Sequence, residues 1–200
     1  SSGGNTPVVE GHMLNEYRYR SVYKGNGKYF NADGSVNPAG GPKGGMIRTE
    51  EDMNWVKAMM DAGYKFKPGN SIGKANIYYG DYIYADVNGD GVYGDSDDEE
   101  FQGRSKTPKY NFGFQASAAW NGFDISMVWA GAAGFDIYWG PTAGYNAAKT
   151  EWGNNIAQRI ADDHYFYDPS NPDDPRTNIN GKYPRMTYLD GNVQNNASSN

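Results

Sequence analysis

The chain of 200 residues contains no cysteine. Disulfide scaffolds, zinc–thiolate sites and cysteine nucleophiles are therefore excluded. It also has no run of 18 apolar residues, so the sequence predicts no transmembrane helix. No basic patch of the kind that binds nucleic acids is visible in the sequence either.

Several signs of enzymatic chemistry are missing as well. The sequence has no G-x-x-x-x-G-K-[ST] phosphate loop. Its two histidines, His12 and His164, lie far apart, and we interpret each as a surface or packing residue. The adjacent acids Glu50-Glu51 and Asp162-Asp163 would point in different directions on a helix, so they form no acid–base pair. We therefore expect no catalytic residues and no enzyme.

Glycine, tyrosine and acid are what the chain has in quantity. The 27 Gly and the aromatic content of 15%, with 17 Tyr, favour strands and turns over helices. The net charge is −6, yet residues 86–100 alone hold five Asp and two Glu with no Lys or Arg. The acidity therefore belongs to one segment rather than to the whole surface.

This acidic segment has the ligand spacing of an EF-hand-type calcium loop. Oxygen side chains fall at positions 1, 3, 5 and 12 of twelve residues, and Gly91 occupies position 6, where the backbone must turn. Position 7 supplies a backbone carbonyl, and a water is expected at position 9. The sequence thus predicts one structural Ca²⁺ bound by Asp86, Asn88, Asp90, Val92 and Asp97. An acidic surface turn without metal remains the alternative.

A second pattern, over residues 109–131, predicts an antiparallel hairpin. Apolar residues from Tyr110 to Trp120 alternate with small and polar ones, and the alternation resumes at Phe123. Asn121-Gly122 between the two arms favours a type I′ turn. Each arm is about as long as a tilted strand that crosses a bilayer. A soluble sheet with one buried face would alternate in the same way.

The remaining segments are predicted more coarsely. Residues 13–24 alternate as a strand, and residues 25–107 form a long loop. Within it, Thr49 and Asp52 form a capping pattern for a helix that Gly63 ends. Residues 136–200 form a second long loop with a short helix over 154–162. Both chain ends have loop composition, which leads us to expect a segment of a longer protein.

The order of several short motifs resembles that of a known family. They are Asp86-x-Asn88-Gly89-Asp90-Gly91, Gly103, Pro108-Lys109-Tyr110, Phe112-Gly113-Phe114, Gly122-Phe123-Asp124-x-Ser126 and Gly131, preceded by Glu10-Gly11 and by the helix at 50–60. In this order they resemble the SusC/RagA-type TonB-dependent outer-membrane transporters. The resemblance covers residues 8–140, and its most specific part is 86–131.

The resemblance implies an all-β fold: antiparallel strands of a transmembrane β-barrel, with long external loops that carry one or two short helices. Residues 1–200 would be a partial barrel segment in a bacterial outer membrane. It would consist of strand 13–24, external loop 25–107 with the calcium loop 86–97, hairpin 109–131 and external loop 136–200. The family takes up oligosaccharides or peptides with a SusD-like surface lipoprotein, and TonB passes on the energy.

Aromatic residues in the two loops are candidates for ligand contact, because aromatic faces stack on sugar rings. They are Tyr78, Tyr79, Trp139, Tyr145, Trp152, Tyr165 and Tyr167. The sequence equally allows these residues to form the cores of the loops or to contact the lipoprotein. Two other classes of protein also remain: a soluble calcium-stabilised β-type binding module, and a secreted hydrolase domain.

Overall fold

The computed structural model describes residues 9–67, 69–74, 76–137 and 158–186. They belong to two compact units. The described part of the first unit is 9–19 and 101–137, and that of the second is 20–67, 69–74, 76–100 and 158–186. Strand predominates over helix, as the sequence predicts. No helix in the described ranges is long and apolar enough to cross a membrane.

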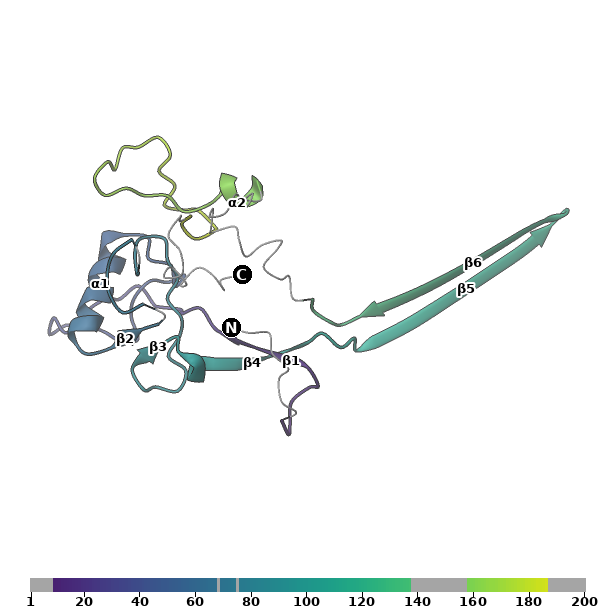
Figure 1. Cartoon of the computed structure of the whole chain (residues 1–200), viewed down its shortest axis with the longest axis horizontal. Helices are drawn as coiled ribbons and strands as arrows, with labels where there is room; N and C mark the ends of the chain where they lie inside the picture. The colour runs from purple at the N-terminus through teal and green to yellow at the C-terminus, as the bar shows by residue number, and fades with distance from the viewer. Residues whose placement is uncertain (1–8, 68, 75, 138–157, 187–200) are drawn as a thin grey trace. The chain divides into compact units, whose positions relative to one another are not determined.

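The second unit is organised around helix α1, Glu50–Asp61 (Figure 1). The predicted capping box is present: the Thr49 hydroxyl accepts the Asp52 N–H at 3.3 Å, and the Asp52 carboxylate accepts the Thr49 N–H at 3.0 Å. Helix α1 ends before Gly63, whose φ of 97° suits glycine. The apolar face of the helix carries the fully buried Trp55 and Met59. Local sequence signals therefore specify this helix.

The core of the second unit combines residues of α1 with residues of two short strands and of irregular segments. Strands β2, Lys65–Phe66, and β3, Val92–Tyr93, form a short parallel pair. The buried cluster consists of Ile47, Met53, Trp55, Val56, Met59, Phe66, Ile77, Ile83 and Tyr93. The indole N–H of Trp55 donates to the Asn37 carbonyl at 2.9 Å, which fixes a loop over the helix. Most of the stretch 25–107, including the predicted helix, thus lies in a folded unit with its own core.

Strand β1, Glu16–Arg20, pairs with β4, Glu99–Ser105, and most residues of both strands belong to the first unit. Strand β1 is shorter than the predicted strand 13–24. The carboxylate of Glu16 is 4% exposed and accepts the N–H groups of Met13 and Gly103 at 2.9 and 2.7 Å. These bonds hold the pKa of Glu16 below its ordinary value. His12 joins the same carboxylate at 3.2 Å and stacks on Phe101, so this histidine is a packing residue as expected.

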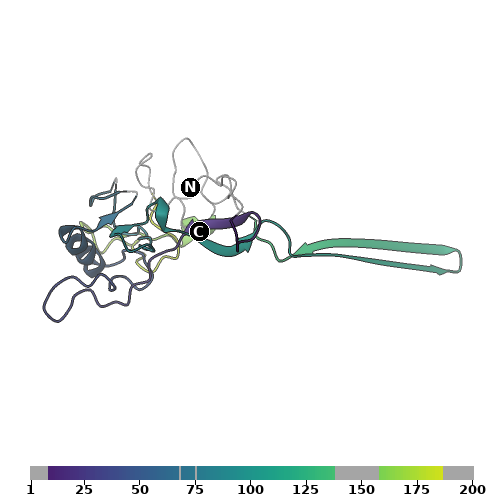
Figure 2. The same ribbon diagram turned by 90° about the horizontal axis from the view of Figure 1, so that it is seen from below.

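Strands β5, Tyr110–Trp120, and β6, Phe123–Ala133, form the predicted hairpin (Figure 2). They are antiparallel, and Trp120 pairs with Phe123 across a two-residue turn. Asn121 and Gly122 have φ of 51° and 88°, as a type I′ turn requires. Each strand has only the other as a neighbour in its sheet. The described residues therefore contain a two-stranded ribbon. The barrel that the resemblance implies remains a proposal.

The described C-terminal segment belongs to the second unit. Helix α2, Gln158–Asp162, is the described end of the predicted helix 154–162, and the following residues are irregular. Tyr165 is 1% exposed and donates its hydroxyl to the Arg48 carbonyl at 2.7 Å. Arg185 makes two hydrogen bonds, of 2.6 and 3.0 Å, to the fully buried Asp81. These contacts attach the segment to the core of the unit.

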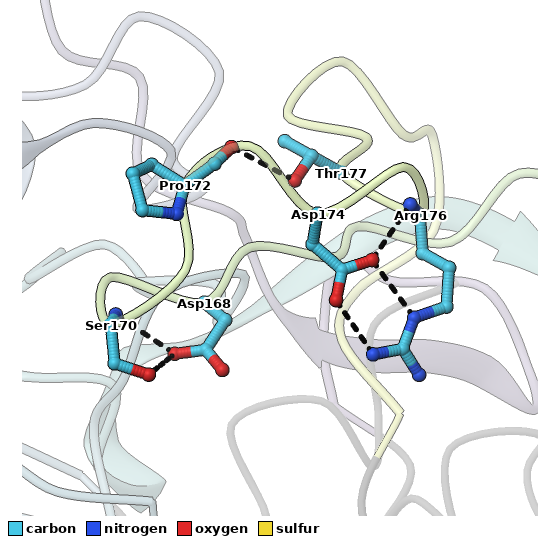
Figure 3. A network of polar contacts seen from close by, with 6 residues as sticks. All are labelled: Asp168, Ser170, Pro172, Asp174, Arg176 and Thr177. Atoms are coloured by element: carbon cyan, nitrogen blue, oxygen red, sulfur yellow. Dashed lines mark hydrogen bonds and ion pairs between the residues drawn. The ribbon is translucent and has the colours of Figure 1, made fainter.

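A loop in this segment is ordered by its own side chains (Figure 3). Asp168 accepts the N–H and the hydroxyl of Ser170 at 2.9 and 2.7 Å. Asp174 accepts Nε and Nη2 of Arg176 at 2.9 and 2.7 Å. The guanidinium of Arg176 also lies 4.8 Å from the centre of the Phe166 ring. The loop thus lacks regular secondary structure but has a defined conformation.

Candidate functional site

The first half of the acidic loop is a series of side-chain-to-backbone turns. Asp86 accepts the N–H groups of Gly89 and Gly91 at 2.7 and 2.9 Å. The side-chain amide oxygen of Asn88 accepts the Asp90 N–H at 2.9 Å, and the Asp90 carboxylate accepts the Val92 N–H at 2.8 Å. Three of the predicted ligands are therefore held in one tight turn by their own hydrogen bonds.

The second half of the loop differs from the sequence prediction. Asp97, predicted at position 12, is exposed at the surface in a 3₁₀ turn, η1, Ser96–Asp98. Its neighbour Asp98 is fully buried instead. Asp98 accepts the N–H groups of Val87 and Gly94 at 2.7 and 2.8 Å, so it ties the two ends of the loop together. The carboxylate that closes the loop is Asp98, because η1 shifts the inward position by one residue.

The donor set of this loop is compatible with calcium in chemistry. Each carboxylate oxygen has two lone-pair sites, so an oxygen that accepts one amide N–H can still coordinate a cation. The Val92 carbonyl is not used in the β2–β3 pairing, where Gly91 and Tyr93 accept the N–H groups of Lys65 and Lys67. Within the described ranges, however, no three His, Cys, Asp or Glu side chains converge to hold a metal ion. Calcium therefore stays a prediction.

The second candidate site is the apolar face of the β5–β6 hairpin. The register places the apolar residues of both strands on one face, where Phe114 lies opposite Trp129 and Ala118 opposite Ile125. The large members of this face are 46% to 77% exposed: Tyr110, Phe112, Phe114, Trp120, Phe123, Ile125, Met127 and Trp129. In a soluble sheet this face would be buried against a core. Here it is open along the whole ribbon.

Packing within the hairpin face is local and aromatic. The rings of Phe114 and Trp129 stack with centroids 5.1 Å apart. Phe112 covers Gly131, where an added Cβ would lie 2.4 Å from the ring. Such cross-strand pairs stabilise a strand pair by up to about 1 kcal/mol each. They fix the register of the hairpin but leave most of the apolar surface uncovered.

The opposite face of the hairpin carries mostly small or polar side chains. It carries Asn111, Gly113, Gln115, Ser117, Ala119, Asp124, Ser126, Val128, Ala130 and Ala132. Asp124 is the single charged residue between Tyr110 and Ala133. One face is thus continuous hydrocarbon and aromatic surface, while the other contains the hydrogen-bonding groups. This is the two-sided pattern of a strand between lipid and a polar interior.

The aromatic candidates for ligand contact separate into two groups. Tyr165 is a core residue, as its burial and its bond to Arg48 show. Tyr78, Tyr79 and Tyr167 are half-buried and form a connected cluster with ring centroids 5.3 and 5.4 Å apart. Trp139, Tyr145 and Trp152 lie outside the described residues.

Residues 69–73 also match a sequence pattern found in hydrolases. Gly69-Asn70-Ser71-Ile72-Gly73 fits G-x-S-x-G, the pattern of a hydrolase nucleophile elbow. That elbow places the serine between a strand and a helix. Ser71 instead lies in an exposed irregular segment. His164 binds the carbonyl of Ala161 through Nδ1 at 2.7 Å. The segment therefore does not form a nucleophile elbow.

Comparison with known proteins adds no family assignment. No family model, no curated protein and no solved structure matches this chain.

Proposed function

We propose that this chain forms part of the β-barrel of an outer-membrane, TonB-dependent nutrient importer of the SusC/RagA type. The observation that carries the proposal is the exposed apolar face of β5–β6. Burying such a face in lipid removes it from water at a gain of roughly 25 cal/mol per Å². A two-stranded ribbon alone is at best marginally stable in water. Lipid on the apolar side would remove the main cost of this exposed surface.

The dimensions of the hairpin support the proposal. Each strand has 11 residues, which extend about 34 Å at roughly 3.4 Å per residue. A tilt of about 40° reduces this to about 26 Å, close to the roughly 25 Å apolar band of outer-membrane barrels. Exposed aromatic residues lie at both ends, Tyr110 at the open end and Trp120 beside the turn. Aromatic residues at both ends are typical of the two membrane interfaces.

A membrane location also places demands on the strand edges. In hydrocarbon every backbone N–H and C=O must be paired, so the outer edges of β5 and β6 need further strands. The proposal therefore makes β5–β6 two neighbouring strands of a larger closed sheet. Partners in transport would be a SusD-like surface lipoprotein, TonB, and an oligosaccharide or peptide ligand, as the motif order suggests.

The acidic loop has a structural role in this proposal. One Ca²⁺ held by Asp86, Asn88 and Asp90 would offset the repulsion among the seven acids of residues 86–100. Oxygen ligands on a flexible loop suit Ca²⁺ better than zinc, which favours Cys and His. The ion would pin the segment outside the membrane and take no part in a reaction.

Labelling of whole cells that make the full-length protein tests the topology. Single cysteines placed at Ser35 and Ser170 should react with a membrane-impermeant thiol reagent, because both segments would lie outside the cell. A cysteine at Asn121 should react only after the outer membrane is permeabilised, because the short turn would be periplasmic. Equal labelling of all three in intact cells would reject the topology.

The compact core of the second unit favours one alternative, a soluble calcium-stabilised β-type binding module. In such a module, protein rather than lipid would cover Phe114, Ile125 and Trp129. The two proposals therefore differ in what surrounds the same three side chains.

A further inference from the structure

The two ends of the β5–β6 ribbon differ in charge. Beyond the open end, residues 104–109 contain Arg104, Lys106 and Lys109 and no acid. All three side chains are exposed. At the other end, the nearest charge to the Asn121-Gly122 turn is the acid Asp124. The apolar band is thus followed by cations at one end only, which we term the basic end.

The basic end is continuous with the apolar face. Lys109 directly precedes Tyr110, the first residue of that face, which is 66% exposed. Arg104 is 71% exposed and pairs with Asp136 at 3.1 Å. This is the only acid within residues 101–110 and 131–137, so the cations outnumber the acids there. An ion pair between exposed groups is weak and leaves Arg104 available to an anion.

We infer that the basic end binds the anionic, phosphate-bearing head groups of the lipid leaflet at the open end of the hairpin. The inference rests on the proposed function and identifies a partner of the same hairpin. Cations next to an apolar band lie at the depth of the head groups when that band enters hydrocarbon. Lysine binds phosphate as a compact point charge, and each cation near an anionic surface contributes about 1 kcal/mol.

The partner follows from the charge and position together. An anionic protein would need complementary shape, whereas a leaflet needs only cations aligned with the edge of the apolar band. The turn end, with Asp124 and no Lys or Arg, would face a leaflet or compartment without this attraction. The charge asymmetry therefore also orients the hairpin in the bilayer.

Binding of the whole chain to lipid vesicles tests the inference. The parent and the double variant Lys106→Gln/Lys109→Gln are titrated with vesicles of phosphatidylcholine alone, and with vesicles in which part of it is replaced by phosphatidylglycerol. Lys57→Gln/Lys65→Gln is the matched control, because these exposed lysines lie on α1 and β2 and change the charge equally.

We expect the parent and the control to bind the anionic vesicles more tightly than the neutral ones. The double variant should bind the anionic vesicles about thirtyfold more weakly, and added salt should reduce its difference from the parent. Equal binding of the parent to both kinds of vesicle, or equal loss in the control, would overturn the inference while the membrane proposal stands. No binding to either kind of vesicle would also overturn the inference, whereas the membrane proposal is tested by the cysteine labelling of whole cells.

Discussion

At the scale of single residues, Asp98 is the side chain on which the acidic loop depends. It is fully buried and accepts four backbone N–H groups, from Val87, Asn88, Gly94 and Asp95. Hydrogen bonds to a charged group are stronger than neutral ones, and amides left unpaired in a buried site are costly. Asp98 therefore organises the loop before any cation binds.

We expect Asp98→Ala to lower the free energy of unfolding of the second unit by about 3 kcal/mol. The exposed neighbour is the control: Asp97→Ala should change it by less than about 0.5 kcal/mol. Urea titrations followed by Trp fluorescence, with chelator present, measure both. A larger loss for Asp97→Ala would restore Asp97 to the inward position predicted from the sequence.

The calcium prediction also belongs to this scale. Added Ca²⁺ should raise the thermal midpoint of the parent, because an ion that binds only the folded state stabilises it, by about 2.7 kcal/mol at 100 times the dissociation constant. Asp90→Ala should remove most of this rise. Asp33→Ala is a matched control, since Asp33 makes a similar turn with Ser35 elsewhere in the unit. If the midpoint of the parent does not respond to Ca²⁺, the loop is an acidic turn without metal.

At the scale of elements, the loop around Asp174 should respond to acid. Hydrogen bonds from Arg176 lower the pKa of Asp174 to about 2. A lowered folded-state pKa stabilises the loop above the unfolded value of about 3.9, and this stabilisation is lost as the pH falls through about 2. The Nε–H resonance of Arg176 should therefore stay protected from neutral pH to below about 4 and lose its protection as the pH falls through about 2.

Two variants isolate this pair. Asp174→Asn should remove the acid transition of the Arg176 resonance, whereas Asp173→Asn, at the exposed neighbour, should leave it unchanged. A transition that survives Asp174→Asn would mean that another acid controls the loop.

The elements that the sequence predicts well are those with strictly local causes. Helix α1 follows from the Thr49–Asp52 capping box and from Gly63, all within one short stretch. The hairpin follows from a period of two and from Asn121-Gly122, whose positive φ values fix the turn and hence the register. Neither element depends on residues far away in the chain.

The core of the second unit outside α1 could not be predicted in the same way. Its core gathers Ile47, Ile77 and Ile83 from segments without helical or strand periodicity. Their burial depends on contacts between distant parts of the chain, such as Trp55 with Asn37. The shift from Asp97 to Asp98 has a related cause, because spacing alone cannot show that a 3₁₀ turn at 96–98 rotates the loop by one residue.

At the scale of the whole molecule, the ion pair of Asp81 and Arg185 links distant segments of the second unit. The residues are 104 positions apart, and Arg185 also donates to the Asn76 carbonyl at 3.2 Å. Replacing one member of a buried ion pair leaves the other charge buried, which typically costs about 3–5 kcal/mol. We expect Asp81→Asn and Arg185→Met each to destabilise the second unit by this amount.

The double variant Asp81→Asn/Arg185→Met should cost less than the sum of the two single ones, because no unpaired charge remains. A double-mutant cycle from urea unfolding measures the difference. Single variants that each cost under about 1 kcal/mol would show that the C-terminal segment is held by Tyr165 and its neighbours instead.

The central claim is that lipid contacts the apolar face of β5–β6, and a spin-label scan of residues 123–133 in the membrane-inserted full-length protein tests it most directly. Labels at Phe123, Ile125, Met127 and Trp129 should be accessible to oxygen dissolved in lipid and inaccessible to a water-soluble nickel chelate. Labels at Asp124, Ser126 and Val128 should lack this oxygen exposure, so that the two profiles alternate with a period of two. Low accessibility to both reagents at Ile125 and Trp129 would mean that protein covers the face, and would contradict the proposal.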